Sequence, residues 1–191
     1  MAPASKSPPQ AVYLLPLASL QSLPDPHTHD FHRFPFPGNI LCNILQLAMT
    51  PLLKNHNIFE NRVYEGLEET VKKLKEAGKR LVVATSKPEP FARIIMDYFH
   101  LTPYFDYIAG MELDGGRNTK AEVIAYALEC CEIEDRSRVL MIGDRKHDIE
   151  GARAEGISSL GVLYGFGDRE ELEAAGADYI VGLPGEILKY A

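Results

Sequence analysis

The stretch that decides the fold is Val139-Leu-Met-Ile-Gly-Asp-Arg-Lys-His-Asp-Ile-Glu-Gly-Ala152, an apolar run followed by Asp144 and Asp148. The apolar residues predict a buried strand, and Gly143 would let the chain turn sharply where that strand ends. Open α/β sheets place their ligands at this carboxyl end of the strands. Two carboxylates there, at the start of a helix, predict oxygen ligands for Mg²⁺. Asp144 as a plain helix cap is the alternative.

Two more segments carry polar residues at such places. Arg80-Leu-Val-Val-Ala-Thr-Ser-Lys-Pro88 predicts a second buried strand that ends at Thr85 and Ser86, just before a helix. Hydroxyls and helix-start N–H groups together suit a phosphate, although such residues also end ordinary strands. Lys120 opens an amphipathic helix, where it would neutralise a phosphate or a carboxylate. A solvated lysine is the alternative, because Lys is mostly exposed.

In this order the three segments resemble motifs II, III and IV of the haloacid-dehalogenase-like (HAD) phosphohydrolases, from about residue 57 to residue 191. The phosphoglycolate-phosphatase-like and nucleotidase-like branch is the most similar. The motifs that carry this resemblance are Ala84-Thr-Ser-Lys-Pro88, Asn118-Thr-Lys-Ala-Glu122 and Gly143-Asp-Arg-Lys-His-Asp148. The resemblance implies Mg²⁺-dependent hydrolysis of the phosphomonoester of a small phosphorylated metabolite.

The same resemblance implies a role for each polar residue. Thr85, with Ser86 beside it, would bind the phosphate of the substrate. Lys120 would be the catalytic lysine that holds nucleophile and phosphate together. Asp144 would bind Mg²⁺, and Asp148 would support that metal site.

The first motif of the family is missing from this chain. In the family it is a strand ending Asp-x-Asp-Gly-Thr, whose first aspartate attacks phosphorus and whose second acts as general acid and base. No Asp-x-Asp occurs here. Extending the apolar run 11–15 places Pro16 and Ala18 at the two aspartate positions, whereas aligning Leu23-Pro-Asp-Pro26 with the family's Leu-Thr-Asp-Pro places Ala18 and Leu20 there. We prefer the second register. Neither supplies a carboxylate, so the phosphatase is predicted to be inactive as given.

The pattern of elements predicts an α/β fold, a HAD-like doubly wound parallel sheet with a reduced helical cap. In the family the strand of the first motif is central, so we expect residues near 11–17 to fill that place. We divide the chain into a divergent segment 1–56 and a HAD-like core 57–191. Expected helices are 66–77, 89–99, 119–130, 146–155, 168–175 and 184–190; expected strands are 79–85, 106–109, 138–142, 158–163 and 178–181. The glycine-containing run 161–167 is predicted to be a strand leading into a loop near the site.

Composition excludes several classes of protein. A net charge of −7 without a basic stripe argues against nucleic-acid binding. No apolar run reaches the roughly 18 residues of a membrane span. Three cysteines match neither a disulfide framework nor a zinc site, which favours a cytoplasmic protein. The spacing of His27, His29, Asp30 and His32 fits no zinc pattern either, and the oligomeric state stays open.

Two functions remain open from the sequence. One is the Mg²⁺-dependent phosphatase that motifs II to IV imply. The other is a non-catalytic HAD-like pseudoenzyme, or a truncated or mis-spliced gene product, with a binding or structural role. The second follows from the missing Asp-x-Asp and from a break in composition near residue 52, since nine of the 13 prolines lie in residues 1–51.

Overall fold

The computed structural model describes residues 12–15, 20–22 and 61–190. Its main sheet has six strands in the order β5-β4-β1-β6-β7-β8, and all pairings in it are parallel. The strands are β1 (Val12–Leu15), β4 (Arg80–Pro88), β5 (Tyr107–Met111), β6 (Val139–Gly143), β7 (Ser158–Val162) and β8 (Tyr179–Val181). The predicted doubly wound parallel sheet is confirmed.

The amino-terminal strand β1 occupies the centre of this sheet. Leu15 pairs with Val83 of β4, and Leu14 pairs with Met141 of β6. Both side chains of β1 in these pairs are buried. Residues 12–15, which lie within the predicted range, therefore supply the central strand, and the strands of motifs II and IV keep their backbone partners.

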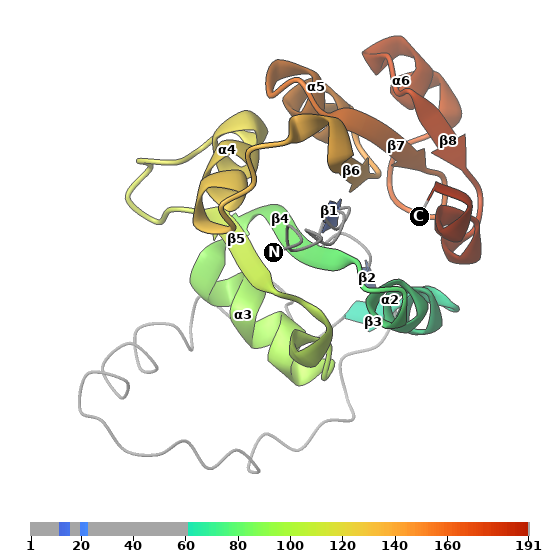
Figure 1. The fold of residues 1–191 in the computed structure, drawn as a ribbon, viewed down its shortest axis with the longest axis horizontal. Coiled ribbons are helices and arrows are strands. Elements are labelled where there is room, and N and C mark those ends of the chain that lie inside the picture. Colours follow the sequence, from blue (N-terminus) through green and yellow to red (C-terminus); the bar gives the residue numbers. More distant parts are fainter. Residues whose placement is uncertain (1–11, 16–19, 23–60, 191) are drawn as a thin grey trace, which may run out of the picture.

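Helices cover both faces of the sheet. Figure 1 shows α4 and α5 on one side and α2 and α3 on the other, while α6 packs beside α5. The helices are α2 (Leu67–Glu76), α3 (Glu89–Tyr98), α4 (Lys120–Cys130), α5 (Lys146–Ala154) and α6 (Arg169–Ala175), with short 3₁₀ turns η1 (Thr102–Tyr104) and η2 (Arg136–Arg138). Gly78, Gly156 and Gly176 follow α2, α5 and α6 with positive φ angles, a conformation that favours glycine at the ends of helices.

Strand β4 shows why its sequence is apolar almost throughout. Val82 and Ala84 face the core beneath α4, whereas Leu81 and Val83 face the cores beneath α2 and α3. Successive side chains of a strand point to opposite faces, and both faces of a parallel sheet are covered. The strand is therefore buried on both sides from Leu81 to Thr85, the first polar residue after the apolar run.

The structure departs from the prediction in three places. The segment 184–190 is a 3₁₀ helix, η3 (Pro184–Tyr190), and the predicted α-helix there is wrong. Strand β4 continues to Pro88 because Pro88 pairs with Met111 after an irregularity in register. Two short strands that were not predicted, β2 (Leu20–Ser22) and β3 (Asn61–Val63), form a separate antiparallel pair.

Some predictions fall outside the described ranges. The histidine-containing cluster 27–32 and most of the proposed cap lie there, and the division at residue 56 stays a prediction. In the part of the chain that is described, no helix combines the length and the apolar character needed to cross a membrane.

Candidate active site at the carboxyl edge of the sheet

Lys120 is fixed at the first turn of α4. Thr119 and Glu122 cap that helix reciprocally: Glu122 N–H donates to Thr119 Oγ1 at 3.2 Å, and Thr119 N–H donates to Glu122 Oε2 at 2.8 Å. The Lys120 side chain is buried, donates to the Ala84 carbonyl at 3.0 Å and pairs with Asp148 Oδ1 at 2.8 Å. The alternative of a solvated lysine is wrong.

Asp148 uses both carboxylate oxygens within the protein. While Oδ1 pairs with Lys120, Oδ2 accepts the N–H groups of Asp144 and Arg145, each at 3.1 Å. A β-carbon on Gly143 would lie 2.1 Å from Asp148 Cβ, and Gly143 does not have a positive φ. The glycine is therefore required by this close approach and not by a left-handed turn. Asp148 is placed to support the site and to hold Lys120.

Asp144 is buried beside Asp148 but is held differently. Its Oδ2 accepts the N–H of Phe166 at 2.8 Å, whereas its Oδ1 is buried without a hydrogen-bond partner among the described residues. Burial raises the pKa of this carboxyl group, and the charge of Asp148 adds to the rise, against the lowering effect of the Phe166 N–H. Asp148 accepts the N–H at the start of α5, so the alternative that Asp144 merely caps that helix is wrong.

The loop after β7 wraps closely around Asp144. Gly167 N–H donates to the Asp144 carbonyl at 2.9 Å, and a β-carbon on Gly165 would lie 2.2 Å from Asp144 Cβ. The prediction of a loop near the site is confirmed. The sequence analysis did not predict the hydrogen bond from Phe166 N–H to Asp144. The glycines on either side of Phe166 were the sequence signal that could have indicated it.

Thr85 and Ser86 end up in different surroundings. Thr85 is buried next to Ala84, whose carbonyl binds Lys120, so Thr85 and Lys120 are brought to the same edge of the sheet. Thr85 Oγ1 accepts the Lys87 N–H at 3.2 Å, which leaves the hydroxyl proton available to a ligand. Ser86 is exposed. The roles of these residues in phosphate binding stay predictions.

The residues present fit a magnesium ion in part. A buried carboxylate oxygen without a partner is costly unless a cation binds it, and Asp144 Oδ1 has no partner among the described residues. Mg²⁺ is commonly held by one or two carboxylates and keeps several waters. Within the described ranges, however, no three His, Cys, Asp or Glu side chains gather as a ligand set. Asp144 would be the protein ligand, and the missing nucleophile would leave the site weaker than in the family.

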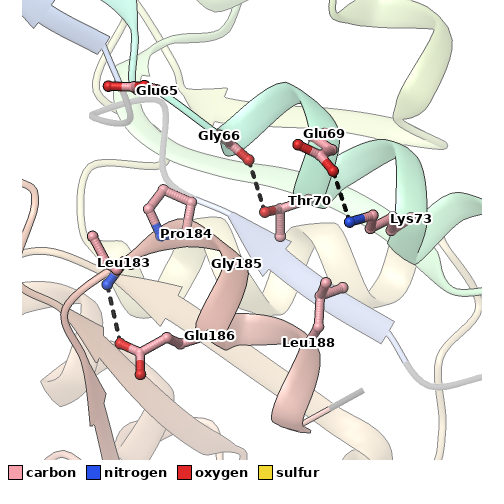
Figure 2. A pocket seen from close by; sticks show the side chains of 10 residues that line it. All are labelled: Glu65, Gly66, Glu69, Thr70, Lys73, Leu183, Pro184, Gly185, Glu186 and Leu188. Carbon is pink, nitrogen blue, oxygen red and sulfur yellow. Dashed lines mark hydrogen bonds and ion pairs between the residues drawn. The ribbon is translucent and has the colours of Figure 1, made fainter.

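A separate groove lies between α2 and η3, with a volume of about 420 Å³. Figure 2 shows Leu183, Pro184 and Leu188 facing the side chains of α2 across it. Two of its carboxylates are engaged with the protein, since Glu69 pairs with Lys73 and Glu186 accepts the Leu183 N–H. None of the predicted site residues lines this groove.

Comparison with known proteins establishes the family. The model of the haloacid dehalogenase-like hydrolases matches residues 45–162. The chain belongs to this family, which confirms the resemblance drawn from motifs II to IV.

Individual relatives cover part of their own length. A 5'-nucleotidase of Pseudomonas aeruginosa is 45% identical over 117 residues, which are 61% of this chain and 52% of the relative. A phosphoglycolate phosphatase of Caulobacter vibrioides is 36% identical over 128 residues, 64% of this chain and 51% of the relative. The tyrosine-protein kinase PtkA of Mycobacterium tuberculosis is 42% identical over 107 residues, 56% of this chain and 36% of the relative. The chain thus spans about half or less of the length of these curated relatives.

Among solved structures, a predicted phosphatase from Clostridium acetobutylicum is similar over 95% of this chain and 98% of its own, with a TM-score of 0.72 and 32% sequence identity. The similarity agrees with the α/β fold described above.

Proposed function

We propose that this protein binds Mg²⁺ and the phosphate group of a small phosphorylated metabolite at the carboxyl edge of its sheet, and that the chain as given hydrolyses phosphomonoesters negligibly. One observation carries the proposal. Thr85 lies on β4 and Asp144 directly follows β6, the two neighbours of β1, and Lys120 at the start of α4 is buried with them, whereas residues 12–22 contain no carboxylate. The relatives named as a nucleotidase and a phosphoglycolate phosphatase support the substrate class.

Each residue has a chemical task in this proposal. Bound Mg²⁺ would supply positive charge for the phosphate oxygens. Asp144 Oδ1 is the buried oxygen available to the cation. Lys120, held by Asp148 and the Ala84 carbonyl, neutralises the phosphate, and the Thr85 hydroxyl donates to it. Without an aspartate that attacks phosphorus, binding and charge neutralisation remain but the covalent step of the family is lost.

Two measurements test the proposal together. Phosphate release from an aryl phosphate with Mg²⁺ should stay far below about 1 s⁻¹, the lower end of common enzyme turnover. Binding of orthovanadate, a phosphate analogue, should require Mg²⁺ and should be lost in Asp144→Asn. The matched control is Asp114→Asn, which alters an exposed aspartate in the loop after β5. Turnover above that limit that Asp144→Asn abolishes would contradict the predicted inactivity. Absence of Mg²⁺-dependent vanadate binding in the unaltered chain would contradict the binding proposal.

Repair of the first motif tests the same idea in the opposite direction. The pairs Leu15–Val83 and Leu14–Met141 bring the end of β1 beside Thr85 and Asp144 in sequence register, whereas Leu20 belongs to β2 in the separate sheet. These pairings favour the first register over the one preferred from sequence.

Pro16→Asp with Ala18→Asp should therefore restore a low Mg²⁺-dependent phosphatase activity, and Ala18→Asp with Leu20→Asp should not. Lys120→Ala in the repaired background should remove the activity again. If both folded double variants stay inactive and gain no affinity for Mg²⁺, this segment does not stand at the position of the first motif.

A further inference from the structure

Two buried polar atoms near the end of β6 lack a hydrogen-bond partner among the described residues. One is Asp144 Oδ1, which the proposed function assigns to a cation. The other is the Tyr164 hydroxyl, two residues beyond β7. Buried polar groups are almost always partnered, so each of these atoms requires an explanation. A ligand that reaches both atoms explains them together.

The position of Tyr164 places it beside the site and not in a remote part of the core. Its ring packs against the cluster that contains Leu15, the last residue of β1, and Ile142, which precedes Gly143 and Asp144. The Tyr64 ring contacts it edge to face, with centroids 5.1 Å apart. The next residues of the same loop hold Asp144, because Phe166 N–H donates to Asp144 Oδ2. The same short loop therefore contains both the N–H that hydrogen-bonds to Asp144 and the hydroxyl that has no partner among the described residues.

The chemistry of the hydroxyl fits a hydrated cation. The side chain of a tyrosine is a neutral phenol at neutral pH. A neutral phenol both donates and accepts hydrogen bonds, and it is too weak a base to replace a carboxylate as a direct ligand of Mg²⁺. Mg²⁺ keeps several of its waters when one or two carboxylates bind it. A water on the cation would thus find the phenol as its partner.

We infer that Tyr164 is a positioning residue of the cation site, whose hydroxyl hydrogen-bonds to a water molecule coordinated to the divalent cation at Asp144 Oδ1. The inference rests on the proposed function, because it needs the cation at Asp144. It adds a residue outside motifs II, III and IV. Outer partners of this kind orient the ligands of a metal and change its affinity.

Tyr164→Phe separates this role from a role in folding. Because the hydroxyl has no partner among the described residues, its removal should leave the melting temperature of the metal-free protein unchanged or raise it. The same variant should bind the cation about 3- to 10-fold more weakly, the effect of one lost hydrogen bond. Mn²⁺ is a suitable probe, since it shares the preference for oxygen ligands and its free form is measured by electron paramagnetic resonance.

A second readout addresses the water directly. The relaxation rate of water protons with Mn²⁺ bound at saturation should change in Tyr164→Phe, because the held water loses its partner. Tyr64→Phe removes a hydroxyl from the adjacent ring of the same cluster and is the matched control; its Mn²⁺ affinity and relaxation rate should equal those of the unaltered chain.

The outcomes distinguish the two proposals. If the unaltered chain binds Mn²⁺, Asp144→Asn does not, and Tyr164→Phe binds like the unaltered chain, the inference about Tyr164 is overturned while the cation site stands. A lower melting temperature of metal-free Tyr164→Phe would show a partner within the protein and would also overturn it. If the unaltered chain binds no Mn²⁺, or if Asp144→Asn binds it equally well, the cation site fails and the inference falls with it.

Discussion

Two aspartates lie at opposite ends of the strands of the sheet, Asp106 at the amino ends and Asp144 at the carboxyl ends, and their surroundings differ. At the amino edge, Asp106 accepts the Leu81 N–H at 2.8 Å and pairs with Lys75 at 2.6 Å. Burial alone would raise the pKa of Asp106, but these hydrogen bonds and the charges of Lys75 and Arg80 lower it below its usual value. At the carboxyl edge, burial raises the pKa of Asp144, whose Oδ1 lacks a partner in the described part of the chain.

The difference distinguishes a structural carboxylate from the one that we propose binds a cation. Asp106 joins the starts of β4 and β5 to α2, and its interactions are complete within the protein. Asp144 is positioned by the Phe166 N–H and by the close contact with Gly165, yet its Oδ1 has no hydrogen-bond partner among the described residues. Burying an unpartnered carboxylate oxygen costs free energy, so it does not contribute to the stability of the fold. The comparison therefore supports the functional role that we propose for the carboxyl edge of the sheet.

The largest expected effect comes from breaking the buried ion pair at the carboxyl edge. Lys120→Met would leave Asp148 charged and buried without its partner, and would leave the Ala84 carbonyl without its donor. The free energy of unfolding should fall by about 3–5 kcal/mol, measured by urea denaturation. The matched control is Lys73→Met, which removes an exposed pair with Glu69 and should cost at most about 1 kcal/mol. Equal losses in the two variants would contradict the assigned burial of Lys120.

A smaller effect is expected from crowding Asp144. The β-carbon in Gly165→Ala would meet Asp144 Cβ at 2.2 Å, so the loop or the aspartate must move. Such overpacking typically costs about 1–3 kcal/mol of unfolding free energy, and it should also weaken Mn²⁺ binding because Asp144 is displaced. Gly185→Ala is the control, since no atom lies within 4 Å of the added carbon and its φ is not positive. If Gly165→Ala has the same melting temperature as the control, the loop does not pack closely against Asp144.

The smallest effect is expected at the amino edge and depends on pH. The pKa of Asp106 is lowered in the folded protein from its ordinary value of 3.8, so the ionised form stabilises the fold above that value. This stabilisation is lost as the pH falls below 3.8 and through the lower folded-state pKa. Asp106→Asn should cost about 0.5–1.5 kcal/mol at pH 7 and less at pH 3, measured by denaturation at both values. Lys75→Met should weaken the same pH dependence; a cost of Asp106→Asn that is larger at pH 3 would reverse the assigned sign.

Much of the site was readable because its residues follow strands directly. The order of the three motif segments and the absence of Asp-x-Asp were available from local patterns, and the central place of 12–15 followed from the resemblance to the family. Helix starts were equally local: Thr119 and Glu122 cap α4 three residues apart, and this cap fixes the place of Lys120 along the chain. The end of β4 could not be predicted locally, because it depends on the pairing of Pro88 with Met111. The 3₁₀ form of 184–190 could not be predicted locally either, because this segment packs against α2.

The sequence by itself determined the family, the parallel sheet and the residue types gathered at its carboxyl edge, because neighbours along the chain set strand ends and helix starts. The tertiary structure decided what each polar group contacts. Lys120 meets the Ala84 carbonyl across 36 positions, and Phe166 N–H meets Asp144 across 22. Because of those distant partners, Lys120 forms a buried ion pair and is not solvated, and Asp144 does not cap a helix but keeps one buried oxygen without a partner among the described residues. The physical reason is that hydrogen bonding and desolvation depend on which segments pack together in the fold. The hydrophobic periodicity of one segment does not indicate which other segments it will contact.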